Sequence, residues 1–109
     1  MADTRQFGDI ATKLLMENDR VRIWEMRLEP GERSSLHRHD NDYVMIQIDG
    51  DRMAADFEPD SGGPWAGSGG RVEGDIAPGN VIYAERGGVE TAINVGNKPF
   101  YEIVVELKD

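Results

Sequence analysis

The chain contains two histidines, His37 and His39, which are separated by a single residue. In an extended strand, residues two positions apart project from the same face. Two imidazoles placed side by side form a pair of nitrogen ligands that several divalent transition metals accept. The same pattern also arises from two ordinary surface histidines. The spacing alone therefore leaves two alternatives, a metal site and an exposed pair.

The segments around the histidines follow the periodicity of β-strands. Residues 21–28 alternate, with Trp24, Met26 and Leu28 on one face. Gly, Pro and Asn residues then divide the chain into short apolar segments. The further expected strands are 43–48, 52–57, 72–77, 81–84, 90–95 and 101–107. Many short strands without long helices between them predict an all-β sandwich or barrel rather than a parallel α/β sheet.

The first part of the chain has a mixed pattern. Ile10 to Met16 fits either a short strand or a turn of helix. We therefore divide the chain into an N-terminal segment, residues 1–18, and a barrel, residues 19–109. The N-terminal segment could also extend the sheet of a partner barrel.

Two expected strands carry apolar residues on both faces. Residues 43–48 are apolar at nearly every position, and residues 101–107 have one wholly apolar face while Val104 interrupts the charges on the other. A strand with one face in water is polar at every second position. Burial of one face inside the barrel and of the other against a second copy explains the pattern, so we expect a homodimer. A strand covered within one monomer is the alternative.

Composition limits the kinds of function. A chain of 109 residues with 39% hydrophobic residues can build one core, and it has no apolar run near the ~20 residues of a membrane helix. The absence of cysteine excludes disulfides, thiolate zinc sites and a cysteine nucleophile. The net charge of −9 disfavours nucleic acid and anionic membranes as partners. Without a recognisable leader, we expect a cytoplasmic protein.

The histidines lie in a longer motif, Gly31-x5-His37-x-His39-x3-Tyr43-x6-Gly50. This motif resembles the first conserved motif of the cupins, in which a glutamate stands where this chain has Tyr43. The resemblance implies a single-domain cupin, a jelly-roll β-barrel also described as a double-stranded β-helix.

A second segment, Gly79-x5-Glu85-x-Gly87-x2-Glu90-x3-Asn94, is similar to the second cupin motif. Cupins usually have a proline where this chain has Glu85 and a histidine where it has Glu90. The end of the chain further resembles small cupins that are associated with β-alanine degradation.

The resemblance implies a metal centre with an altered ligand set. His37 and His39 match two of the usual three histidines, Glu90 replaces the third, and Tyr43 replaces the usual glutamate. Two histidines and a carboxylate are typical of non-haem Fe(II) enzymes, and Mn, Ni, Co or Zn would accept them too. Because a neutral phenol is a poor ligand, we expect Tyr43 to hydrogen-bond a substrate or a water. Alternatively, the site has decayed and Glu90 points into solvent.

Strand parity adds candidates for a substrate pocket. Gln47 shares the face of Tyr43, Asn94 shares the face of Glu90, and Trp24 and Met26 share a face of the early strand. For most of these, ordinary core packing is the alternative. The glycine-rich segment 58–70 is either a mobile cover over the barrel mouth, anchored by Trp65, or an exposed hairpin tip.

Three functions remain from the sequence. The first is a metal-dependent enzyme that acts on a small polar or carboxylated molecule, with Glu90 and Tyr43 as catalytic residues; oxidation is the first expectation, and isomerisation or hydration is the second. The others are a non-catalytic binding or sensing protein that uses the same pocket, and a metal-free dimeric barrel.

Overall fold

A computed structural model of the chain describes residues 4–67 and 69–108 and contains nine strands and no helix in these ranges. The strands are β1 Lys13–Glu17, β2 Val21–Leu28, β3 His37–Arg38, β4 Tyr43–Asp49, β5 Arg52–Phe57, β6 Arg71–Asp75, β7 Val81–Ala84, β8 Val89–Asn94 and β9 Phe100–Leu107. The all-β prediction is confirmed; three of the seven expected strands match the observed bounds, and the other four differ by one or two residues at an end. Within the described residues, no helix could cross a membrane.

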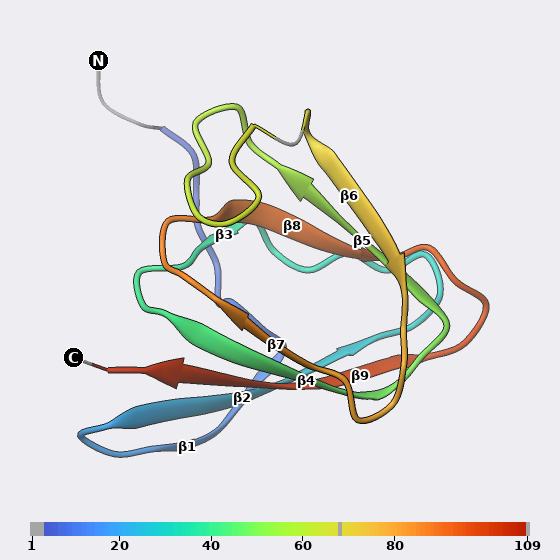
Figure 1. Ribbon diagram of the computed structural model, residues 1–109, viewed down its shortest axis with the longest axis horizontal. Coiled ribbons are helices and arrows are strands. Elements are labelled where there is room, and N and C mark those ends of the chain that lie inside the picture. Colours follow the sequence, from blue (N-terminus) through green and yellow to red (C-terminus); the bar gives the residue numbers. More distant parts are fainter. Residues whose placement is uncertain (1–3, 68, 109) are drawn as a thin grey trace.

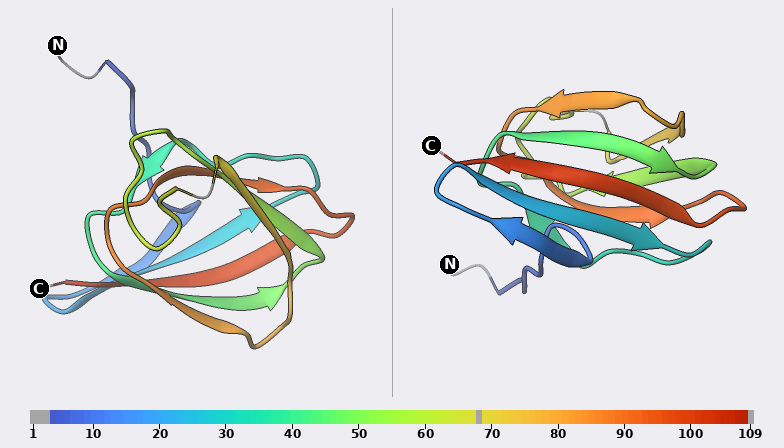
Figure 2. Two further views of the ribbon diagram at one scale, coloured as in Figure 1. Left: turned by 45° about the horizontal axis from the view of Figure 1, so that its top comes forward. Right: turned by 90° about the horizontal axis from the view of Figure 1, so that it is seen from below.

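The strands form two antiparallel sheets that face each other. One has the order β1-β2-β9-β4-β7, and the other has the order β3-β8-β5-β6. Figure 1 shows the smaller sheet above the larger one, and the right-hand view in Figure 2, from below, shows the strands of the larger sheet side by side. Consecutive strands such as β2 and β3 lie in different sheets, so the chain winds around a shared interior.

The N-terminal segment forms a short strand, not the turn of helix that its sequence also allowed. Residues Lys13–Glu17 form β1, which pairs with β2 of the same chain. Ile10 and Ala11, which precede β1, are buried in the core. Farther upstream, the backbone amide of Gly8 donates to the carbonyl oxygen of Leu36 at 2.8 Å. This segment therefore lies beside the strand that carries the histidines.

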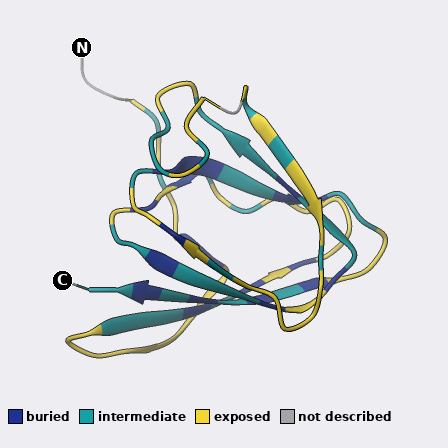
Figure 3. Cartoon of the chain, in the orientation of Figure 1, coloured by how far each residue is buried: buried dark blue, intermediate teal, exposed yellow. Residues whose placement is uncertain are grey.

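The barrel interior is lined by alternate residues, as the pleat of a strand requires. Trp24, Met26 and Leu28 of β2 are buried on one face, as predicted. On β9 the buried face carries Phe100 and Val104 together with the two glutamates of that strand. Figure 3 shows β1 exposed along its length, whereas β8 is buried at both ends and half-buried in the middle.

The outward face of the larger sheet is apolar across several strands. One row runs across four strands through Ile23, Val105, Val44 and Tyr83, which are paired in register. Tyr83 is 56% exposed, and Val81, two residues before it on β7, is 60% exposed. The apolar residues of β9 that the sequence singled out therefore face away from the core, and the charged ones face inward.

Candidate metal centre

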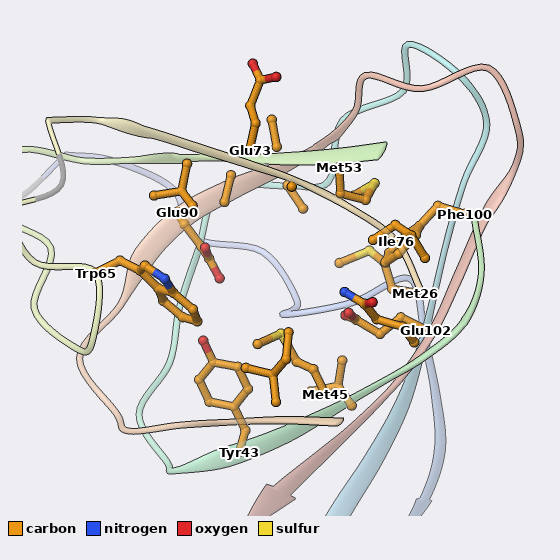
Figure 4. A pocket seen from close by; sticks show the side chains of 18 of the residues that line it. Met26, Tyr43, Met45, Met53, Trp65, Glu73, Ile76, Glu90, Phe100 and Glu102 are labelled. Carbon is orange, nitrogen blue, oxygen red and sulfur yellow. The ribbon is translucent and has the colours of Figure 1, made fainter. Parts of the chain in front are cut away.

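A cavity of about 320 Å³ lies between the two sheets. His37, His39, Glu90 and Tyr43 line it at one end, and methionines and other apolar side chains line most of the remainder. Figure 4 shows Glu90 and Tyr43 on one side of the cavity and Glu102 on the opposite side, with Met45 below and Met53 above.

His37 and Glu90 lie directly opposite each other on paired strands. The register of β3 and β8 aligns His37 with Glu90. Cross-strand partners have Cβ atoms only about 5 Å apart on the same face. The Nε2 atom of His37 is 3.5 Å from Oε1 of Glu90, and both residues are buried.

His39 joins the pair because the ladder continues beyond the end of β3. Its backbone amide donates to the carbonyl oxygen of Gly88, and the amide of Gly87 donates to the carbonyl oxygen of His39, both at 2.9 Å. The side chain of His39 therefore shares the face of His37. Its Nε2 atom lies 2.9 Å from Oε1 of Glu90. The two histidines therefore lie on one face, as expected, and both are buried, so they are not the exposed pair that the spacing also allowed.

Hydrogen bonding prepares the two imidazoles differently. Nδ1 of His37 lies 2.9 Å from the backbone carbonyl oxygen of Ser35, which only accepts, so Nδ1 carries the proton. The other ring nitrogen, Nε2, lies toward the carboxylate of Glu90. Nδ1 of His39, by contrast, is buried and has no hydrogen-bond partner among the described residues. Ser35 thus fixes the tautomer of His37, whereas the ring of His39 is held through its other nitrogen, Nε2, by the carboxylate of Glu90.

The electrostatics of the cluster favour an ionised carboxylate. Burial by itself would raise the pKa of Glu90, but hydrogen bonds from His37 and His39 outweigh burial and hold the pKa at about 2. The cluster therefore keeps a negative charge in the barrel interior at neutral pH. Such a charge requires a proton on an imidazole or a bound cation as its counterpart.

The donor set fits a divalent transition metal. One nitrogen from each histidine and one carboxylate oxygen lie within 4.8 Å of one another, and all three residues are buried. In the neutral state, the lone pair of His37 Nε2 faces a carboxylate oxygen across 3.5 Å, and a cation between them removes that repulsion. Two imidazoles and a carboxylate suit Fe, Mn, Ni, Co and Zn.

Tyr43 reaches the site by a route that the sequence did not predict. Residues 40–42 form no strand, and Tyr43 begins β4, which belongs to the sheet opposite that of β3. Its ring stacks on the imidazole of His39, with centroids 3.8 Å apart and planes at 10°. Burial, together with the charges of Glu90 and Glu102, raises the pKa of Tyr43 well above its ordinary value. The phenol therefore stays protonated and can donate a hydrogen bond.

The other predicted pocket residues divide into two groups. Gln47 and Met26 line the cavity, whereas Trp24 and Asn94 are not among its lining residues. The indole nitrogen of Trp24 donates to Glu106 at 2.6 Å. The amide of Asn94 donates to the carbonyl oxygens of Leu28 and Lys98, so it organises the chain after β8. Trp24 and Asn94 are therefore buried, as their alternation predicts, but their polar groups bond to other parts of the barrel and not to the cavity.

Gly62 and Gly63, in the glycine-rich segment 58–70, pack against the loop that leads into β8. The amide of Gly62 donates to the carbonyl oxygen of Gly87 at 2.8 Å. Gly87 has φ +112°, and a Cβ there would lie 3.0 Å from the backbone nitrogen of Gly63, so this approach requires glycine. Trp65 stacks on Phe57 with ring centroids 5.7 Å apart and lines the cavity. Trp65 therefore reaches the cavity from this segment, although several of its other residues are exposed; that the segment is a mobile cover stays a prediction.

Sequence reasoning missed Glu102, a buried glutamate that lines the cavity opposite the histidines. Because Glu102 alternates with the apolar Tyr101 and Ile103, it was assigned to the charged face of β9 and not considered for the cavity. The signal that could have found it is its shared face with Phe100 and Val104, because those residues must face a core.

Comparisons with known proteins show the fold. No protein-family model and no curated protein matches the chain. A crystal structure of a cupin domain from Bordetella pertussis is similar with a TM-score of 0.74 and 24% identity, over 98% of this chain and 100% of that one. A cupin family protein with a double-stranded β-helix fold from Methanocaldococcus jannaschii has a TM-score of 0.66 and 18% identity, over 99% and 92%. A cupin superfamily protein from Desulfitobacterium hafniense has a TM-score of 0.63 and 17% identity, over 98% and 84%.

These likenesses show that the chain has the cupin fold, the double-stranded β-helix that its two motifs predicted. They give no support for the similarity to cupins of β-alanine degradation. The fold does not determine the chemistry of the site, which has to be argued from its own residues.

Proposed function

We propose that this cupin-fold chain is a metal-dependent enzyme in which His37, His39 and Glu90 hold one divalent transition metal. The observation that carries the proposal is the buried convergence of the three side chains, with Glu90 Oε1 2.9 Å from His39 Nε2 and 3.5 Å from His37 Nε2. A bound metal would supply Lewis acidity or a site for dioxygen.

The residues around this centre have distinct roles in the proposal. Ser35 holds His37 in the tautomer that leaves Nε2 free. Tyr43 stays protonated and donates a hydrogen bond to the ligand at this end of the cavity. The cover segment with Trp65 limits access of water, which strengthens electrostatic interactions inside. If the metal leaves Glu90 free, its carboxylate is the general base of the site.

The charge and size of the site favour a small carboxylated ligand. A divalent ion and the carboxylate of Glu90 together leave one positive charge at this end, and a ligand carboxylate neutralises it. The cavity of about 320 Å³ is near the lower limit for binding sites of small molecules. Its walls are mostly apolar, so the body of the ligand is expected to be apolar as well.

The first reaction class is an oxidation with dioxygen as the oxidant, because two histidines and one carboxylate leave coordination positions open. Isomerisation or hydration with a Lewis-acidic metal is the second. Oxygen consumption by metal-loaded protein with a panel of small carboxylic acids separates the two classes. Conversion of an acid without oxygen uptake would contradict oxidation, and binding without any conversion would point to a sensing protein.

Metal analysis of purified protein tests the centre itself. We expect close to one metal per chain, with nearly complete loss in His37→Ala, His39→Ala and Glu90→Ala. Arg38→Ala is a matched control, since Arg38 lies between the histidines, is exposed, and pairs with Asp40. Glu85→Ala is the control for Glu90→Ala, because Glu85 is an exposed glutamate five residues before the buried Glu90. Full metal content in Glu90→Ala would remove Glu90 from the ligand set, and metal-free wild-type protein would refute the proposal.

The proposal includes a cytoplasmic homodimer that buries the apolar outward face of the larger sheet. That face carries Tyr83 and Val81, which are 56% and 60% exposed in a single chain. Large apolar patches on one surface commonly mark interfaces. Because the chain has a mass of 12.1 kDa, we expect a species of about twice that mass in solution and a monomer for Val81→Glu. A monomeric wild-type protein would contradict this part of the proposal.

A further inference from the structure

The end of the cavity away from the histidines contains a carboxyl group that nothing described so far uses. Glu102 lies on the inward face of β9 and is 7% exposed. No hydrogen bond or ion pair joins its side chain to another residue in 4–67 or 69–108. It lines the cavity, and Figure 4 shows its carboxyl group facing the interior across from Glu90. Burying a carboxyl group without a hydrogen-bond partner costs free energy of folding. Such groups occur where a bound ligand supplies the missing hydrogen bond.

The surroundings keep this carboxyl group protonated. Its register partners on β2 and β4 are Met26 and Gln47, which carry no charge. Phe100 and Ile76 line the cavity nearby in Figure 4. Burial, and secondarily the negative charge of Glu90, raises the pKa of Glu102 to about 8. At neutral pH the group therefore offers an O–H donor rather than a negative charge.

Gln47 places a second donor beside it. The amide oxygen of Gln47 accepts hydrogen bonds from the backbone amide of Ala77 at 3.1 Å and from the side chain of Asn80 at 3.3 Å. A backbone N–H can only donate, so the oxygen must face Ala77 and the NH₂ group must point away from it. Among the described residues, no hydrogen bond uses this NH₂ group. Gln47 and Glu102 are paired in register on the same inward face.

We propose that Glu102 and Gln47 form a second recognition site, which binds an uncharged carbonyl or hydroxyl oxygen at the far end of the ligand. Two adjacent donors match the two lone pairs of such an oxygen. A ligand ammonium group is a poorer match, because it would form a buried ion pair among methionine and aromatic side chains. The inference rests on the proposed function in one respect, that the other end of the ligand is a carboxylate at the metal.

The two ends set the length of the ligand. Tyr43 at the metal end and Gln47 at the far end are four residues apart on β4, which corresponds to about 13 Å along the strand. The side chains occupy part of this span. Keto acids with a carboxylate at one end and a ketone at the other, of five to seven carbons, are therefore suitable probes.

Calorimetric titration of Co²⁺-loaded protein tests the site with 4-oxopentanoate, 5-oxohexanoate and 6-oxoheptanoate, each against the plain alkanoate of the same length. For at least one length, we expect the keto acid to bind about fivefold more tightly than its parent, as one net hydrogen bond provides. Glu102→Gln retains a neutral donor and should keep this ratio. Glu102→Leu removes one of the two donors and should reduce the ratio at least about twofold, while the parent alkanoate still binds.

Absence of a ketone preference at every length in wild-type protein, or an undiminished preference in Glu102→Leu, would overturn the inference. Tighter binding of 6-aminohexanoate than of the keto acids would overturn the choice of an uncharged acceptor. Metal content, measured on the same samples, reports separately on the metal centre.

A second titration needs no metal. Metal-free protein is titrated with 2-hexanone and followed through the NMR signals of the cavity methionine methyl groups. Several-fold weaker binding to Glu102→Leu, with recovery in Glu102→Gln, supports the far-end site even if the metal proposal fails. Equal affinity in all three proteins rules the site out.

Discussion

Two buried glutamates lie on the same face of β9, four residues apart, and their surroundings differ completely. Glu106 accepts hydrogen bonds from the indole nitrogen of Trp24 at 2.6 Å, from Arg22 at 3.3 Å and from Asn41 at 3.2 Å. Glu102 has no such bond to the described residues. Both side chains are more than nine-tenths buried.

This difference in hydrogen bonding separates a glutamate with a structural role from one with a role in binding. A buried carboxylate that is fully bonded holds its neighbours in one arrangement and contributes to stability once it is in place. A buried carboxyl group that lacks partners reduces stability, and it is consistent with selection for binding rather than for folding. Glu90 lies between these cases, because its hydrogen bonds come from the histidines that we propose as metal ligands. The three glutamates therefore form a series from structural to functional.

The largest expected effect is on stability, for a substitution of Glu106, the glutamate with a structural role. Glu106→Gln replaces a charged acceptor by an amide whose NH₂ group must face one of three donors. We expect a loss of about 3 kcal/mol in the free energy of unfolding, the range for breaking a buried charged network. Urea denaturation with an unchanged m-value measures it. A loss below about 1 kcal/mol would show that Trp24 and Arg22 find other acceptors.

The same substitution at Glu102 should increase the free energy of unfolding instead of reducing it. With a pKa of about 8 in the folded state and an ordinary value of 4.5, Glu102 binds a proton on folding between these pH values. The folded state then holds more protons than the unfolded state, so stability falls as pH rises from about 5 to 8. Glu102→Gln removes this loss, and we expect a gain of about 2 kcal/mol at pH 7.

Denaturation of metal-free protein at several pH values measures this effect. The wild-type curve should lose stability over the interval from about pH 5 to 8, and the difference from Glu102→Gln should be close to zero near pH 4. A difference between the two proteins that does not change with pH would mean that Glu102 is not held protonated. The gain would also show that the wild-type residue is retained at the expense of stability.

The sequence predicted those parts of the molecule that depend on local pattern. Alternation and turn residues located the strands, and the spacing of His37 and His39 placed both on one face. Glu90 could be added only through the resemblance to a known motif, because its pairing with His37 joins positions 53 residues apart on β8 and β3. Local periodicity contains no information about which distant strand becomes a neighbour.

The inward direction of Glu102 and Glu106 has only one sign in the sequence, the face that they share with Phe100 and Val104. On β9 one face is wholly apolar and the other carries charges, so polarity alone suggests that the charged face is outside. In the structure the charged face is inside, because Glu106 is satisfied there by Trp24 and Arg22 from β2. The parity of Trp24 was predicted correctly, but its bond to Glu106 places it in the framework and not in the pocket.

The smallest expected effect tests how the support of Glu106 is divided among its partners. Arg22 is the most distant of the three, its side chain is 31% exposed, and it also bonds Glu17. Solvent weakens such a contact, so Arg22→Met should reduce the free energy of unfolding by only about 0.5 kcal/mol, and by less at high salt. Chemical denaturation in 0.05 and 1 M NaCl measures this change. A loss close to that of Glu106→Gln would show that the arginine, rather than the indole of Trp24, keeps Glu106 charged, and the contrast with Glu102 would then depend on ion pairing alone.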